Sequence, residues 1–341
     1  MRSVLLTISW AIIFIPGMCG AQGGTWETLA PLSLARQETG AALLDGKVYV
    51  TGGLLSGNPS SNTATMEVYD IAGDLWSGLE PMPLGLDHHG MVELGGLLYV
   101  LGGNTRSLTG SGVVRDEMFV YNPVNDTWSP GPPLPALRAG GWAAAHSGRI
   151  YFVGGSDGAG VSHSSFYIFD TAVGGWSTGT PMTVARNHLN VVIHGGYLYA
   201  IGGRHLSTSY TAIERYDIAN DSWQTMAPLP TARAAMACAV IDNKIYCAGG
   251  ETPMLFAVNE VYDIASDTWS TDTPMPVPRH GVAAIALEDR MLVAGGGLIQ
   301  GRQPTTHFDA FVPAPPGLGL TPAVAALSIA AAGFVAVRRL C

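Results

Sequence analysis

The sequence predicts an all-β protein folded as a six-bladed β-propeller, because two spacings recur along its 341 residues. A tryptophan lies 26 residues before a glycine doublet in six pairs: Trp26 with Gly52, Trp76 with Gly102, Trp128 with Gly154, Trp176 with Gly202, Trp223 with Gly249, and Trp269 with Gly295. An aromatic residue followed by Asp or Asn lies seven residues before a tryptophan at Tyr69, Tyr121, Phe169, Tyr216 and Tyr262. A sixth such aromatic, Phe308, has no tryptophan after it. A repeat of about 50 residues is the signature of a propeller blade.

Each repeat predicts four strands. Two apolar runs joined by a two-residue turn, the second ending at the glycine doublet, form a hairpin of the first and second strands. The segment around the aromatic residue is the third strand, and the segment around the tryptophan is the fourth. The six predicted turns are Asp45-Gly46, Gly95-Gly96, Ser147-Gly148, Gly195-Gly196, Asp242-Asn243 and Glu288-Asp289.

The two ends of the repeat region predict how the propeller closes. The last repeat has three strands and ends near Phe311, whereas Trp26 lies in a strand without a repeat of its own. We therefore expect the N-terminal strand to complete the sixth blade, which removes the free edges of an open array. The predicted propeller domain spans residues 22–312.

The residues that carry this pattern resemble the kelch family. The glycine doublets read YVTGG, YVLGG, YFVGG, YAIGG, YCAGG and LVAGG, and the aromatic steps read VYD, VYN, IFD, RYD, VYD and HFD. The resemblance covers about residues 25–311 and implies a module that binds a protein, peptide or glycan, since most of the family binds partners. The alternative is a carbohydrate-active enzyme similar to the sialic acid mutarotases, which are six-bladed and exported.

The composition fits a secreted or surface all-β protein. The chain is 47% hydrophobic and 13% charged, and it contains 44 glycines. Its net charge is −9 and no basic stripe occurs, so we expect no nucleic acid partner.

Residues 1–21 predict a secretory signal peptide. A largely apolar run covers residues 4–15, and Cys19 and Ala21 are the small residues expected before a cut after Ala21. A lipoprotein signal through Cys19 is the alternative, although Met18 does not fit the motif that such a signal needs.

Residues 313–341 predict a sorting and membrane-anchor segment. Leu318–Val337 is apolar and uncharged, long enough to span a bilayer, and is followed by Arg338 and Arg339. The preceding PPGLGL resembles the archaeal PGF-CTERM signal, with Leu318 in place of Phe. That resemblance implies cleavage near Gly317 and attachment of lipid, and a plain transmembrane anchor is the alternative. Both predict an exported protein held at the cell surface.

Two cysteines are predicted to face each other. Counting outward from the Asp242-Asn243 turn places Cys238 opposite Cys247 on a non-hydrogen-bonded pair, where side chains approach most closely. Export would permit a disulfide between them. Two buried free thiols are the alternative.

One polar position recurs in the loops that lead into the first strands. Ten residues after the tryptophan, five of the six repeats carry arginine: Arg36, Arg138, Arg186, Arg233 and Arg279. Because first strands line the central channel, these side chains should ring its mouth. They either brace neighbouring loops through backbone carbonyls or bind an acidic or polyhydroxyl ligand. Similar arginines in the redox-sensor kelch domain hold acidic peptides, so the resemblance implies a ligand contact. Because the position recurs in five blades, bracing is the favoured role, with ligand contact as an added role for two or three of these arginines.

The repeats differ from one another at the arginine position and in the segments after the glycine doublets. Leu86 replaces the arginine in the second repeat, and Arg204, directly after a doublet, has no counterpart in the other repeats. The longest segments after the doublets, Leu54–Met66 and Asn104–Met118, should form a wall beside the mouth. We expect the ligand to contact the arginines opposite that wall, namely Arg186, Arg204 and Arg233.

The sequence predicts no catalytic, cofactor-binding or metal-ligating residue. HExxH, CxxC and phosphate-loop motifs do not occur. His88-His89 is the only histidine pair and is expected to be an exposed loop pair rather than a metal site. A copper site of the galactose oxidase type is excluded, because neither Cys238 nor Cys247 lies in the loop position that its tyrosine cross-link needs. A binding module is therefore favoured over an enzyme.

Two acceptor sequons for N-linked glycans occur, at Asn125 and Asn220. Both are expected in turns between third and fourth strands, on the face opposite the arginine loops.

Overall fold

The structure is a computed structural model that describes residues 23–57, 61–106 and 112–315. All regular secondary structure within these ranges is β-strand, and no helix occurs there. The predicted signal peptide and most of the predicted anchor lie outside the described residues. Within the described part of the chain, no helix is long and apolar enough to cross a membrane.

The described chain forms six four-stranded antiparallel sheets, the predicted six blades. Blade one contains β2 (Gly40–Leu44), β3 (Lys47–Thr51), β4 (Met66–Asp70) and β5 (Leu75–Leu79), and blade two contains β6 (Gly90–Leu94), β7 (Leu97–Arg106), β8 (Gly112–Asn122) and β9 (Thr127–Gly131). Blade three contains β10 (Trp142–His146), β11 (Arg149–Val153), β12 (Phe166–Asp170) and β13 (Gly175–Thr178), and blade four contains β14 (Asn190–His194), β15 (Tyr197–Ile201), β18 (Ile213–Asp217) and β19 (Ser222–Thr225). Blade five contains β20 (Ala237–Ile241), β21 (Lys244–Ala248), β22 (Asn259–Asp263) and β23 (Thr268–Asp272), and blade six contains β24 (Ala283–Leu287), β25 (Arg290–Ala294), β28 (Phe308–Val312) and β1 (Thr25–Thr28).

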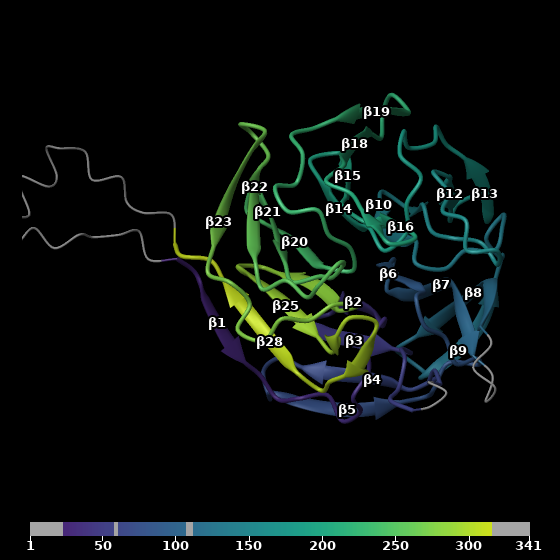
Figure 1. The fold of residues 1–341 in the computed structure, drawn as a ribbon. Coiled ribbons are helices and arrows are strands. Elements are labelled where there is room, and N and C mark those ends of the chain that lie inside the picture. The colour runs from purple at the N-terminus through teal and green to yellow at the C-terminus, as the bar shows by residue number, and fades with distance from the viewer. Residues whose placement is uncertain (1–22, 58–60, 107–111, 316–341) are drawn as a thin grey trace, which may run out of the picture. The chain divides into compact units, whose positions relative to one another are not determined.

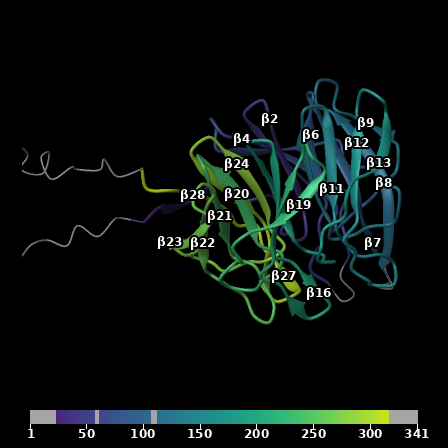
Figure 2. The same cartoon turned by 90° about the horizontal axis from the view of Figure 1, so that it is seen from above.

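The blades are arranged around a central axis, with β2, β6, β10, β14 and β20 near the centre and β5, β9, β19 and β23 toward the rim (Figure 1). Two short hairpins, β16–β17 (Arg204–His205 and Thr208–Ser209) and β26–β27 (Gly297–Ile299 and Arg302–Pro304), follow the doublets of blades four and six. Figure 2 shows β16 and β27 on the same side of the propeller. Segments after the doublets therefore gather on one face.

The propeller closes as predicted, but the third-strand aromatic residue of blade six is not the one that the sequence pattern indicated. β1 pairs antiparallel with β28, and Trp26 lies opposite Phe311, as Trp76 lies opposite Tyr69 in blade one. Phe311 thus holds the third-strand aromatic position, three residues beyond the Phe308 that the sequence pattern indicated. Phe308-Asp309 imitates the aromatic-Asp step, which is why the pattern was misleading there.

The repeated tryptophans connect neighbouring blades. Each indole N–H donates a hydrogen bond to a backbone carbonyl of the preceding blade, for example Trp223 Nε1 to Thr180 O at 2.7 Å and Trp26 Nε1 to Thr273 O at 3.0 Å. In blade four the Tyr216 hydroxyl donates to Asp221 at 2.6 Å, and the same carboxylate accepts the Thr180 amide at 2.9 Å. The recurrent aromatic and tryptophan positions are therefore contacts between blades.

The glycine doublets are required where two blades approach closely. Gly249 has a φ of 69°, and a Cβ there would lie 2.7 Å from the Arg279 carbonyl oxygen. The next residue, Gly250, donates its amide to that carbonyl at 2.8 Å. Only glycine combines this backbone conformation with such close packing.

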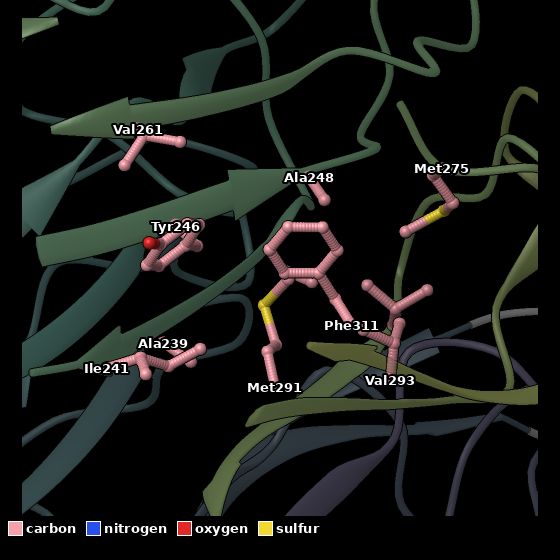
Figure 3. Packing of buried hydrophobic residues seen from close by; sticks show 11 residues of the cluster. Ala239, Ile241, Tyr246, Ala248, Val261, Met275, Met291, Val293 and Phe311 are labelled. Carbon is pink, nitrogen blue, oxygen red and sulfur yellow. The ribbon is translucent and has the colours of Figure 1, made fainter. Parts of the chain in front are cut away.

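The hydrophobic core is divided into six clusters, each lying between two neighbouring blades. Figure 3 shows the cluster between blades five and six, where Phe311 and Met291 face Tyr246 and Ala248. Each blade is therefore stabilised mainly by its two neighbours, as expected for a ring of repeats.

The hairpin of blade five has the predicted register, with Cys238 opposite Cys247. The structure joins them in a disulfide with a Cα–Cα distance of 4.3 Å, the close spacing of a non-hydrogen-bonded pair. Both side chains are buried in the cluster between blades four and five.

The disulfide gives a direct prediction. In the protein purified from oxidising conditions, mass spectrometry after alkylation without reductant should find both Cys238 and Cys247 unmodified. Alkylation of both after denaturation in reductant serves as the control. Labelling of both thiols in the denatured but unreduced protein would contradict the bond.

The predicted glycan acceptors both lie in exposed turns. Asn125 lies between β8 and β9, and Asn220 lies between β18 and β19. Their use remains a prediction.

Candidate functional site

Four of the predicted arginines are fully buried and form ion pairs. Each pairs with an acid on the third strand of its own blade: Arg36 with Glu67, Arg186 with Glu214, Arg233 with Glu260, and Arg279 with Asp309. All four arginine side chains have an exposure of 0%. Burial lowers the pKa of Arg36 and of Arg186 to about 10, against the opposing effect of their carboxylates. The guanidinium groups therefore remain charged at neutral pH.

These arginines also bind backbone carbonyls, as the bracing role requires. Arg233 donates Nε to the Gly249 carbonyl at 2.9 Å and Nη2 to the Cys247 carbonyl at 2.8 Å. One side chain thus ties the loop before a first strand to the second and third strands.

Blades two and three have other contacts in place of the arginine–carboxylate ion pair. Arg138 donates to the Tyr167 hydroxyl at 3.2 Å and to Ser165 Oγ at 3.1 Å. Leu86 is buried in the same apolar cluster as Phe119, which holds the position of the acid in blade two.

The arginines other than Arg204 thus have little or no surface for a ligand. Arg138 is 6% exposed and the remaining four are fully buried. We correct the ligand-contact alternative for Arg36, Arg138, Arg186, Arg233 and Arg279 in favour of bracing, because their donors are directed into the blades.

A closed ring of backbone hydrogen bonds lies two residues beyond the arginine position. Each amide donates to the carbonyl of the preceding blade at 2.6–3.1 Å. In chain order the six members are Glu38, His88, Gly140, His188, Ala235 and Gly281, and the Glu38 amide closes the circle on the Gly281 carbonyl. We call these six residues the mouth ring.

Three members of the mouth ring carry functional side chains that meet at the axis. One ligand-type atom from each of Glu38, His88 and His188 lies within 4.8 Å of the others, and the two imidazole rings contact edge to face with centroids 4.8 Å apart. The expectation that His88-His89 is an exposed pair is wrong. The His88 side chain is 12% exposed and His89 is 4% exposed, because the ring turns this loop toward the axis.

Neighbouring charges push the two histidines apart in pKa. Burial disfavours the charge on His88, but Glu38 and Asp87 outweigh it and raise the pKa of His88 above its ordinary value. Burial, with Arg204 and His88, holds the pKa of His188 well below its ordinary value. His88 is therefore the more basic of the two imidazoles and His188 the less basic, a difference that suits an acid beside a base.

Arg204 is the predicted arginine that lies at the mouth with part of its surface free. Its side chain is 23% exposed and forms an ion pair with buried Glu251 at 2.9 Å. It also donates to Thr252 Oγ1 at 3.2 Å and contacts His188 Nε2 at 3.1 Å. Glu251 additionally lies 3.5 Å from His280 Nε2.

Strand bridges explain why these side chains converge. In all six blades the residue after the doublet bridges to the residue after the arginine position, as in Asn187 with Arg204, and Ala234 with Glu251. The doublet segments are thereby held directly beside the mouth ring.

A hollow of about 360 Å³ lies over this part of the mouth. Its lining includes His188, Arg204, Ser207, Thr252 and Gln300. The predicted wall lies partly outside the described residues: in its described part, β7 and β8 extend blade two as far as the pair Arg106 and Gly112. Arg106 reaches back to Asp87 at 3.0 Å.

A second hollow of about 360 Å³ lies farther along the channel and is lined mainly by first-strand alanine and valine residues. Glu93 is the charged residue of that lining. We place the site at the mouth ring because it brings charged and hydrogen-bonding groups together, whereas the second hollow is mostly apolar.

A closed six-bladed propeller with a polar mouth is the class of protein that this geometry defines. Residues 88–297 match the KLHDC2/KLHL20/DRC7 Kelch-repeats domain, which is more than half of the chain, and residues 35–83 match the Kelch motif. The protein belongs to the kelch-repeat family, whose repeats generally mediate protein binding.

The solved structure of YjhT is similar, with a TM-score of 0.72 over 82% of this chain and 96% of that chain. Sequence identity is 18%, so this likeness shows the fold alone. No curated protein matches this sequence significantly.

Sequence reasoning missed the acids that pair with the arginines, and it missed Glu38 and His188. The acids had a usable signal, since Glu67, Glu214 and Glu260 each lie two residues before the repeated tyrosine. The ring residues also had one, because each lies two residues after the arginine position.

Proposed function

We propose that the protein is a binding module that takes an acidic ligand, such as a carboxylate of a peptide or glycan, over the mouth ring. The observation that carries the proposal is the position of Arg204 in the wall of the mouth hollow. Its bonds to Glu251, Thr252 and His188 leave further N–H donors of the guanidinium for a ligand. An arginine fork held in place by a buried carboxylate is suited to a second carboxylate.

The rest of the hollow supports recognition of a polar ligand. Ser207, Thr252 and Gln300 add hydroxyl and amide groups beside Arg204, and these groups suit the hydroxyls of a glycan or the backbone of a peptide.

An array of acidic peptides and acidic glycans, with neutral members of equal length, tests this function. Arg204→Ala should weaken binding of the acidic members by about 1.5–3 kcal/mol. The variant should lose some stability but stay folded, because buried Glu251 still accepts a hydrogen bond from the Gly301 amide at 2.9 Å and lies 3.5 Å from His280 Nε2. Arg149→Ala is the matched control, since it removes an exposed arginine that pairs with Asp170. Equal loss in both variants, or no preference for acidic members, would contradict the proposal.

A carbohydrate-active enzyme of the mutarotase type is the second candidate function. The specific observation in its favour is the meeting of Glu38, His88 and His188, with the two histidine pKa values displaced in opposite directions. Opening and reclosing a sugar ring needs one group to donate a proton and another to accept one. Acceleration of anomer exchange on a panel of acidic and neutral sugars, lost in Glu38→Gln, would establish it.

We also propose that the protein is exported and held at the cell surface. Residues 1–21 and Leu318–Val337 support this through their sequence patterns. A chain ending at residue 315 should be released into the medium, whereas the full chain should stay with the membrane fraction and be cleaved by protease added outside. Retention of the shortened chain would contradict the anchor.

A further inference from the structure

We propose that the mouth ring is a binding site for a divalent transition-metal ion of the Zn²⁺ class, with Glu38, His88 and His188 as ligands. One carboxylate and two imidazoles form a ligand set that such ions favour. The three ligand atoms lie within 4.8 Å of one another. Ligands at about 2.0–2.2 Å from one ion stand about 3.3 Å apart, so side-chain movements of the order of an ångström would close the site.

The outer hydrogen bonds of both histidines leave Nε2 directed to the shared centre. Nδ1 of His88 bonds the Asp87 carboxylate, which can only accept, so Nδ1 carries the proton. Nδ1 of His188 lies 2.5 Å from Asn187 Oδ1, and the amide nitrogen of Asn187 is committed to Ser162 at 2.7 Å. Metal-bound histidines commonly show this pattern, in which a fixed acceptor orients the ring and sets the tautomer.

The backbone of the mouth ring provides an independent argument. All six members have positive φ, and Glu38, His88 and His188 adopt values of 51–56°. Glycine fills this position in blades three and six, as Gly140 and Gly281. Large side chains in this conformation carry a cost and concentrate at functional sites.

The small members of the ring leave space for the proposed ligands. A Cβ at Gly281 would lie 2.4 Å from Glu38 Oε1, and one at Gly140 would lie 3.1 Å from His188 Nδ1. Three blades thus supply the ligands, and at least two of the others supply the room that they occupy.

Arg204 is expected to oppose the metal. Its guanidinium contacts the His188 Nε2 lone pair at 3.1 Å and brings positive charge to the site. Its other Nη group is held by Glu251 and Thr252, so it can release His188 without leaving the mouth. The metal site therefore does not rest on the proposed binding function, and Arg204 affects the two in opposite directions.

Titration of the full-length protein with Zn²⁺, and with Co²⁺ as a spectroscopic substitute, tests the site. The wild-type protein should bind one ion per chain, and Co²⁺ should develop the visible absorption of a low-coordinate nitrogen and oxygen site. His88→Asn, His188→Asn and Glu38→Gln should each weaken Zn²⁺ binding by at least about 100-fold, since loss of an outer partner alone costs 10–100-fold. Asparagine is chosen because it tolerates positive φ.

Two further variants make the result decisive. His194→Asn, at the far end of β14, should bind Zn²⁺ as the wild type does, and Arg204→Ala should bind it more tightly. Absence of one-to-one binding by the folded wild type, or unchanged binding by the double variant His88→Asn/His188→Asn, would overturn the proposal. The ligand array, repeated in the presence of a metal chelator, tests the proposed binding function separately. A failed metal titration therefore does not decide the binding function, and a failed array does not decide the metal site.

Discussion

Arg233→Met is expected to destabilise the protein by about 3–5 kcal/mol, because it leaves a buried carboxylate without its countercharge. Glu260 is 2% exposed and pairs with Arg233, whose own exposure is 0%. The substitution also removes donors to the carbonyls of Cys247 and Gly249. Equilibrium unfolding in urea, with denaturant midpoint and slope compared with the wild type, measures the loss.

Blade two supplies the matched control for that prediction. Leu86 and Phe119 occupy the equivalent positions there without any ion pair. The double variant Arg233→Leu/Glu260→Phe copies this solution and should recover much of the stability lost by Arg233→Met, since apolar replacement of a buried pair is often neutral. A loss under about 1 kcal/mol for Arg233→Met would contradict the bracing role.

Phe311→Ala should destabilise the protein by about 3–5 kcal/mol, the usual cost of deleting a fully buried aromatic ring. Phe311 is 0% exposed. The centroid of its ring lies 5.4 Å from that of Tyr246 in blade five and 5.2 Å from that of Trp26 in the closing strand. Figure 3 shows its ring at the centre of the cluster that joins the last two blades. Its loss weakens both the cluster and the closure of the ring.

Thermal unfolding followed by tryptophan fluorescence measures this effect. Phe311→Leu, which keeps most of the apolar volume, is the control and should cost much less than the alanine variant. If Phe311→Ala unfolds within a degree or two of the wild type, closure by the N-terminal strand does not depend on this contact.

The sequence allows the propeller to be predicted because the blade contacts repeat along the chain. Trp223 and the Gly249-Gly250 doublet hold their spacing because the Trp223 indole and the Gly250 amide each donate to a carbonyl of a neighbouring blade. Register in the hairpin of blade five followed from its short turn, which fixes Cys238 opposite Cys247. The aromatic of blade six was misassigned because Phe308-Asp309 reproduces the local step, and strand register alone distinguishes Phe311.

The site was less predictable for a physical reason. Glu38, His88 and His188 come from three loops that are far apart in sequence, and they meet only because the propeller brings its loops to one axis. The arginines were conspicuous as a repeat, but repetition marked their structural role, whereas the unrepeated Arg204 lies at the mouth with surface exposed. In a symmetric scaffold, positions that differ between blades are the stronger guide to function.

A crystal structure of the protein with the acidic array member that binds most tightly would test the central claim most directly. We predict ligand density over the mouth ring, with a carboxylate within hydrogen-bonding distance of the Arg204 guanidinium and the rest of the ligand beside Thr252 and Gln300. Density in the apolar hollow farther along the channel, or at the rim of the blades, with Arg204 untouched, would contradict it.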